Sequence, residues 1–426
     1  MLTLAIFGLL IFLILLGVPI AVSMGITAVL GFVFLGQESI LLMMAQRMYS
    51  GTTSFTLLAI PFFIMAGNLM NTGGITNRIF RFAKACVGHV WGGLGQVNIV
   101  ASLIFSGMSG AAVADAAGLG MIELKAMKES GYDDDFSAAI TAASSTIGPV
   151  VPPSIPFVIY ANLTGVSVIS LFLAGFTPGF MMAAAMMIAV FLVSRKRNYP
   201  RTDRAPLKEV LASLGDGLLP IGTPVIIIGG ILLGWFTPTE AAVVACVYAL
   251  ILGLFVYKEL TLKDLPRIVW ETVVHSVRVL FIISCAAFFS WLMIHQQIPQ
   301  KVIVGLTSLT TNPQAVMAII LFILIVLGCF IEGVAVLVIT VPVFMPLITQ
   351  FGIDQVQFGV IMILASMIGL VTPPVGMSLY AVSSISKVSI GRLSKELIPY
   401  IFGIFIVLLL VAYVPAISTW LPNLLN

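Results

Sequence analysis

Ile-Gly-Pro-Val-Val-Pro-Pro occupies residues 147–153, and Ile-Gly-Leu-Val-Thr-Pro-Pro occupies residues 368–374. Glycine permits unusual backbone angles and paired prolines remove two amide donors, so neither stretch is expected to be continuous helix. The equivalent glycines lie 221 residues apart (369 − 148) in a chain of 426 residues. Interrupted backbone in an apolar chain is tolerated only where it is buried in protein or lines a wet cavity. Two interruptions at matching positions of two halves therefore indicate the binding site of a transporter.

The composition is that of a membrane protein, because 60% of the residues are hydrophobic and only 9% are charged. Soluble proteins carry roughly a quarter charged residues. Only helices or closed barrels span lipid, and the long apolar runs of this chain lack strand alternation. We therefore predict an all-α polytopic membrane protein that contacts the lipid bilayer. The sequence contains no Walker motif, nucleophile elbow or glycine-rich dinucleotide turn, so we expect neither an enzyme nor an ATP-driven pump. The net charge of +3 does not indicate a nucleic-acid partner.

Basic residues predict the orientation of the chain. The densest positive cluster lies in residues 195–208, between the two halves, and short basic loops are cytoplasmic. We interpret residues 1–22 as a first spanning helix. Val18-Pro19 corresponds to Thr237-Pro238 in the second half, at an offset of 219 (238 − 19). An odd number of spans per half would invert the second repeat and place both chain termini outside.

The halves are predicted to be inverted repeats. The stretch Phe105–Gly110 interrupts an apolar segment with two glycines and two serines, and its flanks are too short to span the bilayer comfortably alone, which predicts a re-entrant hairpin. The predicted division is a first repeat at 1–194 (hairpin 95–122, broken helix 136–160), a cytoplasmic connector at 195–217, and a second repeat at 218–426 (hairpin 315–349, broken helix 358–385).

Oxygen-bearing residues near both interruptions predict two ion sites. Na⁺ is a hard cation that takes oxygen ligands, and unwound carbonyls and helix C-termini offer partial negative charge. The alternative for the serines is ordinary packing between membrane helices. The predicted first Na⁺ site comprises Ser106, Ser109, Gly148, Val151 and Pro152. The predicted second Na⁺ site comprises Gly328, Gly333, Gly369, Thr372 and Pro373.

Two acids at membrane depth are further candidates, since such residues are costly and usually functional. Asp115 and Glu332 are predicted to couple ion or substrate, although Asp115 could instead lie in water at the mouth of a hairpin. Serines close to the interruptions complete the candidate substrate or coupling set: Ser144, Ser145 and Ser366. Glu240 follows Pro238 and Thr239, which predicts a capped helix start rather than a functional acid.

Three motifs resemble the large membrane subunit of TRAP (tripartite ATP-independent periplasmic) transporters, with a sialic acid member as the leading expectation. They are Phe-Ser-Gly-Met-Ser-Gly-Ala-Ala-Val-Ala-Asp at 105–115, Phe-Thr-Pro-Thr-Glu-Ala-Ala-Val-Val-Ala at 236–245, and Val-Thr-Pro-Pro-Val-Gly-Met-Ser-Leu-Tyr at 371–380. The resemblance covers essentially the whole chain.

The resemblance implies a multi-pass protein of a bacterial inner membrane with the fold of the elevator-type ion-transporter superfamily. It implies two partners, a small four-helix membrane subunit and a periplasmic substrate-binding protein. It also implies Na⁺-coupled uptake of an organic acid such as sialic acid or a C4-dicarboxylate, with the cotransported Na⁺ at the first site named above.

Two alternatives remain open at this point. One is a dicarboxylate/Na⁺ symporter that works without a binding protein. The other is a membrane enzyme or a channel. An intramembrane enzyme should show clustered acids, histidines or cysteines at depth, which this sequence lacks, and a channel needs no inverted pair of hairpins.

Overall fold

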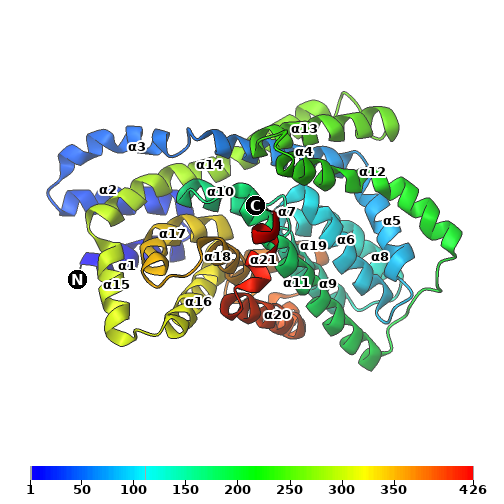
Figure 1. Cartoon of the computed structure of the whole chain (residues 1–426). Helices are drawn as coiled ribbons and strands as arrows, with labels where there is room; N and C mark the ends of the chain where they lie inside the picture. The colour runs from blue at the N-terminus through cyan, green and yellow to red at the C-terminus, as the bar shows by residue number, and fades with distance from the viewer. Residues whose placement is uncertain (1, 111, 426) are drawn as a thin grey trace.

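The computed structural model describes residues 2–110 and 112–425, and every regular element within these ranges is helical (Figure 1). The predicted all-α fold is confirmed. Eight of the described helices are long and apolar enough to cross a membrane. The shorter apolar helices include α6, α10 and α18, which belong to the first hairpin and to the two interrupted helices.

Both halves present, in the same order, a short helix, a hairpin, an interrupted helix and a long spanning helix. The first half contains α1 (Leu2–Leu15), α2 (Ile20–Phe34), η1 (Glu38–Met43), α3 (Met44–Ser50), η2 (Phe55–Leu58), α4 (Ala59–Thr72), α5 (Ile75–Val87), α6 (Gly93–Ser109), α7 (Ala112–Ala117), α8 (Leu119–Glu129), α9 (Asp134–Ser144), η3 (Ser145–Ile147), α10 (Ile155–Thr164) and α11 (Val168–Arg197). The second half contains α12 (Leu207–Leu232), α13 (Pro238–Ile251), η4 (Leu252–Val256), α14 (Leu265–His295), α15 (Ile298–Leu309), α16 (Pro313–Phe330), α17 (Gly333–Gln350), α18 (Gln355–Leu370), α19 (Met377–Ser386), α20 (Ile390–Tyr413) and α21 (Ala416–Leu425).

The predicted first spanning helix at residues 1–22 is wrong. Helix α1 ends at Leu15 and α2 begins at Ile20, because Gly17 adopts a left-handed φ of 83° and Pro19 cannot continue the helical ladder. At 1.5 Å per residue, α1 is about 21 Å long, which is shorter than the hydrocarbon core of about 30 Å. The two helices together are therefore needed to cross the bilayer.

Four helices from the two halves interlock as a scaffold. Helix α2 packs against α14, and α4 packs against α13. The second pair is joined by a hydrogen bond from Cys246 Sγ to Phe62 O (3.0 Å), and α13 also bonds the preceding η2, from Thr239 Oγ1 to Phe55 O (3.0 Å). Glu240 closes a capping box with Thr237 at the start of α13, which confirms its predicted structural role.

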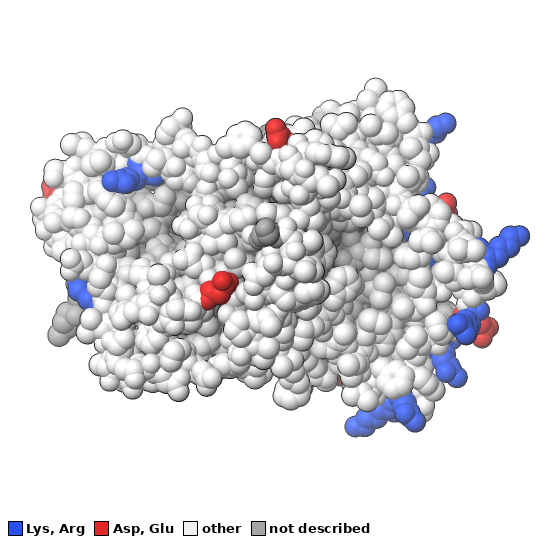
Figure 2. All heavy atoms as spheres, viewed as in Figure 1, with Lys and Arg blue, Asp and Glu red and all other residues white. Residues whose placement is uncertain are grey.

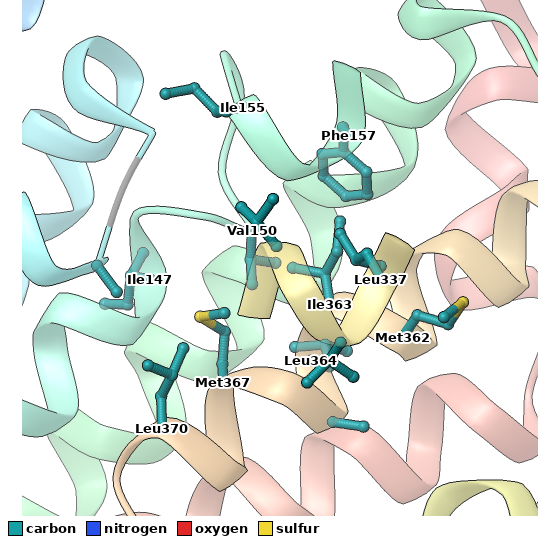
Figure 3. Close-up of a cluster of buried hydrophobic side chains, with 14 of the residues drawn as sticks. Ile147, Val150, Ile155, Phe157, Leu337, Met362, Ile363, Leu364, Met367 and Leu370 are labelled. Carbon is teal, nitrogen blue, oxygen red and sulfur yellow. The ribbon is translucent and has the colours of Figure 1, made fainter. Parts of the chain in front are cut away.

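The two interrupted helices share one core. Figure 3 shows Ile147 and Val150 from the first interruption beside Met367 of α18 and Leu337 of α17. These side chains are almost completely buried. Because residues of both halves form this core, the two interruptions are packed into a single body rather than into two separate lobes.

The connector between the halves is shorter than the predicted 195–217, because α11 continues to Arg197 and α12 begins at Leu207. Three basic residues occupy the last turn of α11, where their positive charges interact favourably with the negative end of the helix dipole. Asn198 then ends the helix with a φ of 51°. Figure 2 shows Lys and Arg side chains gathered at the end of the molecule where α8 and the start of α12 lie, and few charges elsewhere on that face.

We expect labelling of single cysteines to place the two ends of α20 on opposite sides of the membrane. The Arg197–Glu396 ion pair (2.8 Å) joins the first turns of α20 to the basic end of α11, and α20 continues from Glu396 for about 26 Å at 1.5 Å per residue. In a Cys86→Ser background, Arg204→Cys should react with an impermeant maleimide only from the cytoplasm. Ala416→Cys should react only from the periplasm. Reaction of both from one side would contradict the inverted arrangement.

Candidate functional site

The first interruption leaves the helix at residues 148–154, between η3 and α10. Ser154 begins α10 as its N-cap, because its side chain accepts a hydrogen bond from the Phe157 amide (3.3 Å). The same hydroxyl donates to the Pro149 carbonyl. These contacts satisfy polar groups at the restart of the helix, as the surrounding apolar environment requires.

The tip of the first hairpin packs directly against this interruption. A Cβ added at Gly110 would lie 2.8 Å from the Pro153 carbonyl oxygen and 3.1 Å from the Ile155 amide nitrogen. Gly110 also has a left-handed φ of 61° at the end of α6. A side chain is therefore excluded at this position by both backbone conformation and space. The structure thus brings the hairpin tip and the unwound carbonyls together, as the sequence predicted.

The Ser106 hydroxyl donates its proton within its own helix, so its oxygen can act as an acceptor or ligand. It is fully buried, and its Oγ donates to the Leu103 carbonyl over 2.6 Å. Since the proton is committed to its own helix, the remaining lone pairs of the oxygen are available to a cation. Gly148 lies against Asp115, whose Oδ2 occupies the space that a Cβ at Gly148 would need. The side chain of Ser109 lies outside the described part of the structure, although its backbone is the last residue of α6.

The second interruption is held by backbone contacts. Gly328 of α16 and Gly369 of α18 meet so closely that a Cβ at Gly328 would lie 3.1 Å from the Gly369 Cα. The Cys329 carbonyl accepts hydrogen bonds from the amides of Val375 (3.2 Å) and Gly376 (3.0 Å). The end of α16 is thereby fastened to the loop between α18 and α19, which contains Pro373.

Thr372 repeats the arrangement of Ser106. Its Oγ1 donates to the Ile368 carbonyl over 2.6 Å, which leaves its lone pairs free. Gly333, the first residue of α17, lies close to Met367 and Ser366 of α18. The structure therefore brings Gly328, Gly333 and Gly369 together at one junction, with Thr372 at its edge.

The hydroxyls of the three candidate serines all donate hydrogen bonds to other groups of the protein. Ser145 donates to the Ala142 carbonyl (2.9 Å) and Ser366 donates to the Met362 carbonyl (2.7 Å). Ser144 donates to the Asn98 side chain (2.6 Å). Each of the three serines is buried. Their contacts are those of residues that hold the helices rather than of side chains that line an open cavity.

The two candidate acids occupy different environments. Asp115 of α7 is buried beside Gly148, so it does not lie in open water at a hairpin mouth. Glu332 is half-buried at the N-cap position of α17, between the arms of the second hairpin. Within residues 2–110 and 112–425, three or more His, Cys, Asp or Glu side chains nowhere gather as a metal-binding group. The hydroxyls and carbonyls of the two junctions are instead suited to a monovalent cation.

Two features were missed by sequence reasoning. Asn98, Ser102 and Ser106 recur at every fourth position of α6 and are all buried, a helical polar stripe that could have identified Asn98. The other is an open cavity of about 640 Å³ between α14 and α17, bordered by α3, α10 and α15. Its lining contains neutral polar side chains such as Asn162 and Ser290 and no charged one. It depends on tertiary packing, so no sequence signal marks it.

Comparisons with known proteins agree over almost the whole chain. Residues 7–417 match the family described as Tripartite ATP-independent periplasmic transporter, DctM component. The chain is 45% identical to the sialic acid TRAP transporter large permease protein SiaM of Vibrio cholerae, over 96% of this chain and 95% of that protein. It is 37% identical to the C4-dicarboxylate TRAP transporter large permease protein DctM of Pseudomonas aeruginosa, over 95% and 94%.

The fold is also similar to that of a solved transporter. The crystal structure of YdaH from Alcanivorax borkumensis matches with a TM-score of 0.63, over 89% of this chain and 88% of that one. The sequences are 15% identical, so this similarity concerns the fold alone.

We expect Gly369→Ala to disrupt the second junction. The added methyl group would overlap the Gly328 backbone and lie 2.8 Å from the Cys329 amide nitrogen, and backbone cannot swing aside as a side chain can. Overpacking of this kind costs about 1–3 kcal/mol, so thermal unfolding should shift downward and uptake should fall. The control is Gly391→Ala, where the methyl meets nothing within 4 Å. Equal melting temperatures for both variants would contradict the close approach.

Proposed function

Because this chain belongs to the DctM family of tripartite ATP-independent periplasmic transporters, we propose that it is a Na⁺-coupled importer of an organic carboxylate. As a large permease subunit, it is a multi-pass protein of a bacterial inner membrane that carries organic acids by secondary transport and is not an enzyme. The Na⁺ coupling, the motion and the particular substrate are the proposed parts.

The observation that carries the proposal is the pair of junctions between hairpins and interrupted helices. Each junction combines unwound carbonyls with a hydroxyl whose proton is donated to its own helix, Ser106 in one and Thr372 in the other. Carbonyl and hydroxyl oxygens suit Na⁺, and at the first junction the Asp115 carboxylate lies beside them, against Gly148. Binding of both ions and the substrate to the same body would couple substrate uptake to the Na⁺ gradient.

The packing supports an elevator motion. Both interruptions share a common core (Figure 3), whereas α2, α4, α13 and α14 interlock with one another and contact the body around that core through α14 on α17 and α4 on α6. The cavity of about 640 Å³ lies where α14 of the scaffold faces α17 of that body. We propose that the body slides along the scaffold with its ions and substrate, so that each membrane side gains access in turn.

The names of the relatives suggest the substrate class and partners. We propose sialic acid as the leading substrate, since the relative named for it shares 45% identity against 37% for one named for C4-dicarboxylates. We further propose a small four-helix membrane subunit and a periplasmic binding protein as partners, because the family is tripartite. A symporter that works without a binding protein is the second candidate function.

Replacement of the driving ion tests the coupling. Proteoliposomes containing this chain with the small subunit and binding protein of its own operon should accumulate the carboxylate when Na⁺ is supplied outside. Uptake should fall to background when K⁺ replaces Na⁺, because the junctions would lose their ions. Full uptake in Na⁺-free buffer under an imposed proton gradient would contradict Na⁺ coupling.

The two ion sites should respond separately to substitution. Ser106→Ala removes a hydroxyl from the first junction, and Thr372→Val removes one from the second while keeping the shape. A hydrogen bond to a charged group is worth about 1.5–3 kcal/mol, and we take an ion ligand to be similar. The Na⁺ concentration for half-maximal uptake should therefore rise roughly tenfold to hundredfold, and high Na⁺ should partly restore transport.

Matched controls lose the same type of hydroxyl elsewhere. Thr340 donates to the Val336 carbonyl (2.6 Å) and Ser137 donates to the Asp133 carbonyl (2.9 Å), and both are buried. Thr340→Val and Ser137→Ala should leave the half-maximal Na⁺ concentration unchanged. If the controls shift it as much as Ser106→Ala and Thr372→Val do, the ions lie elsewhere.

Omission of single components tests the tripartite arrangement. This chain alone, or with the small subunit but without the binding protein, should show no uptake above that of empty liposomes. Addition of the binding protein loaded with substrate should restore uptake. Robust uptake by the chain alone would favour the symporter that needs no binding protein.

A further inference from the structure

A buried polar contact joins the first hairpin to the first interrupted helix. Asn98 of α6 donates from Nδ2 to the Thr141 hydroxyl of α9 over 2.9 Å, and the Ser144 hydroxyl donates to Asn98 Oδ1 over 2.6 Å. None of these three side chains is more than 1% exposed. Both the donor and the acceptor function of one amide are therefore used between the same two helices.

The second arm of the hairpin closes on the same place. Gly120 of α8 lies against Thr141, because a Cβ added at Gly120 would come within 2.7 Å of Thr141 Cγ2. Helix α9 is thus packed between α6 and α8 at the level of the Asn98 contact. Hydrogen bonds hold α9 on the α6 side, and close packing of Gly120 against Thr141 holds it on the α8 side.

The position of this contact determines the alignment of the first junction. Ser106 follows Asn98 by eight residues (106 − 98), or about 12 Å along α6 at 1.5 Å per residue. Gly148 follows Ser144 by four residues (148 − 144), through η3. A slip of α9 against α6 would therefore move the interruption along the hairpin tip, where a Cβ added at Gly107, next to Ser106, would lie 3.7 Å from the Pro152 carbonyl oxygen.

Apolar side chains alone hold such a register poorly, whereas a single buried amide is a well-attested register device between helices. The second junction is built differently. Helices α16 and α18, both fully described, are joined by no side-chain hydrogen bond, and Ser366 donates within its own helix. There the Gly328–Gly369 backbone contact holds the register by shape.

We infer that Asn98 is a positioning residue for the first ion junction, which it serves by fixing the register of hairpin and interrupted helix without contacting the ion. This inference rests on the Na⁺ coupling proposed above. It assigns the Asn98–Thr141–Ser144 contact a role in ion affinity beyond its role in stability. The two roles make different predictions when all three polar groups are removed together.

The experiment compares two variants of the purified complex by Na⁺-dependent thermal shift, a readout that needs no transport. Asn98→Leu removes the donor to the Thr141 hydroxyl and leaves the Ser144 hydroxyl only its longer contact to the Thr141 carbonyl (3.3 Å), so it should lower the melting temperature and raise the half-saturating Na⁺ concentration. The triple variant Asn98→Leu, Thr141→Val, Ser144→Ala removes all partners, and such apolar replacement is nearly neutral for stability. Its melting temperature should recover, while its half-saturating Na⁺ concentration stays raised about threefold to tenfold.

The scaffold offers a matched control, since Asn68 Nδ2 of α4 donates to Thr272 Oγ1 of α14 over 3.2 Å. Asn68→Leu with Thr272→Val should leave the half-saturating Na⁺ concentration unchanged. Recovery of both melting temperature and Na⁺ response in the triple variant would overturn the positioning role. A wild-type complex with no Na⁺ response, and no effect of Ser106→Ala, would overturn the proposed function and this inference with it.

Discussion

Lipid hydrocarbon offers no hydrogen-bond partner to a peptide group, and this constraint governs every unusual feature of the chain. Each interruption releases backbone polar groups from the helical ladder; residues 148–154 of the first are buried, whereas Pro373 and Pro374 of the second are exposed in this chain. The first is covered by the glycine-rich hairpin tip, and the second is bound through the Cys329 carbonyl. Each hairpin therefore packs at the position where a helix is interrupted.

The same groups that require protection provide the chemistry. A carbonyl freed from a helix and a hydroxyl that has already donated its proton both present lone pairs, and neither carries a formal charge. Oxygens of this kind suit a monovalent cation such as the Na⁺ proposed above.

The two junctions reach similar geometry through different forces. Around the first, Asn98 and its hydroxyl partners align α6 with α9 by directional hydrogen bonds. Around the second, the absence of side chains at Gly328 and Gly369 lets two backbones touch. Repeats that share a topology need not share the interactions that stabilise it, since either polarity or shape can set the register of two helices.

The sequence alone determined the fold class, the family and the two helix interruptions, because hydropathy, glycine and proline act over a few neighbouring residues. The assignment of one spanning helix to residues 1–22 was wrong, because Gly17 and Pro19, both visible in the sequence, end α1 at Leu15 and start α2 at Ile20. Only the tertiary structure decided that Ser144 faces Asn98, that Asp115 lies beside Gly148, and that α14 and α17 border a cavity. Those relations join residues distant in the chain, and they depend on how helices are rotated and spaced, which local pattern does not encode.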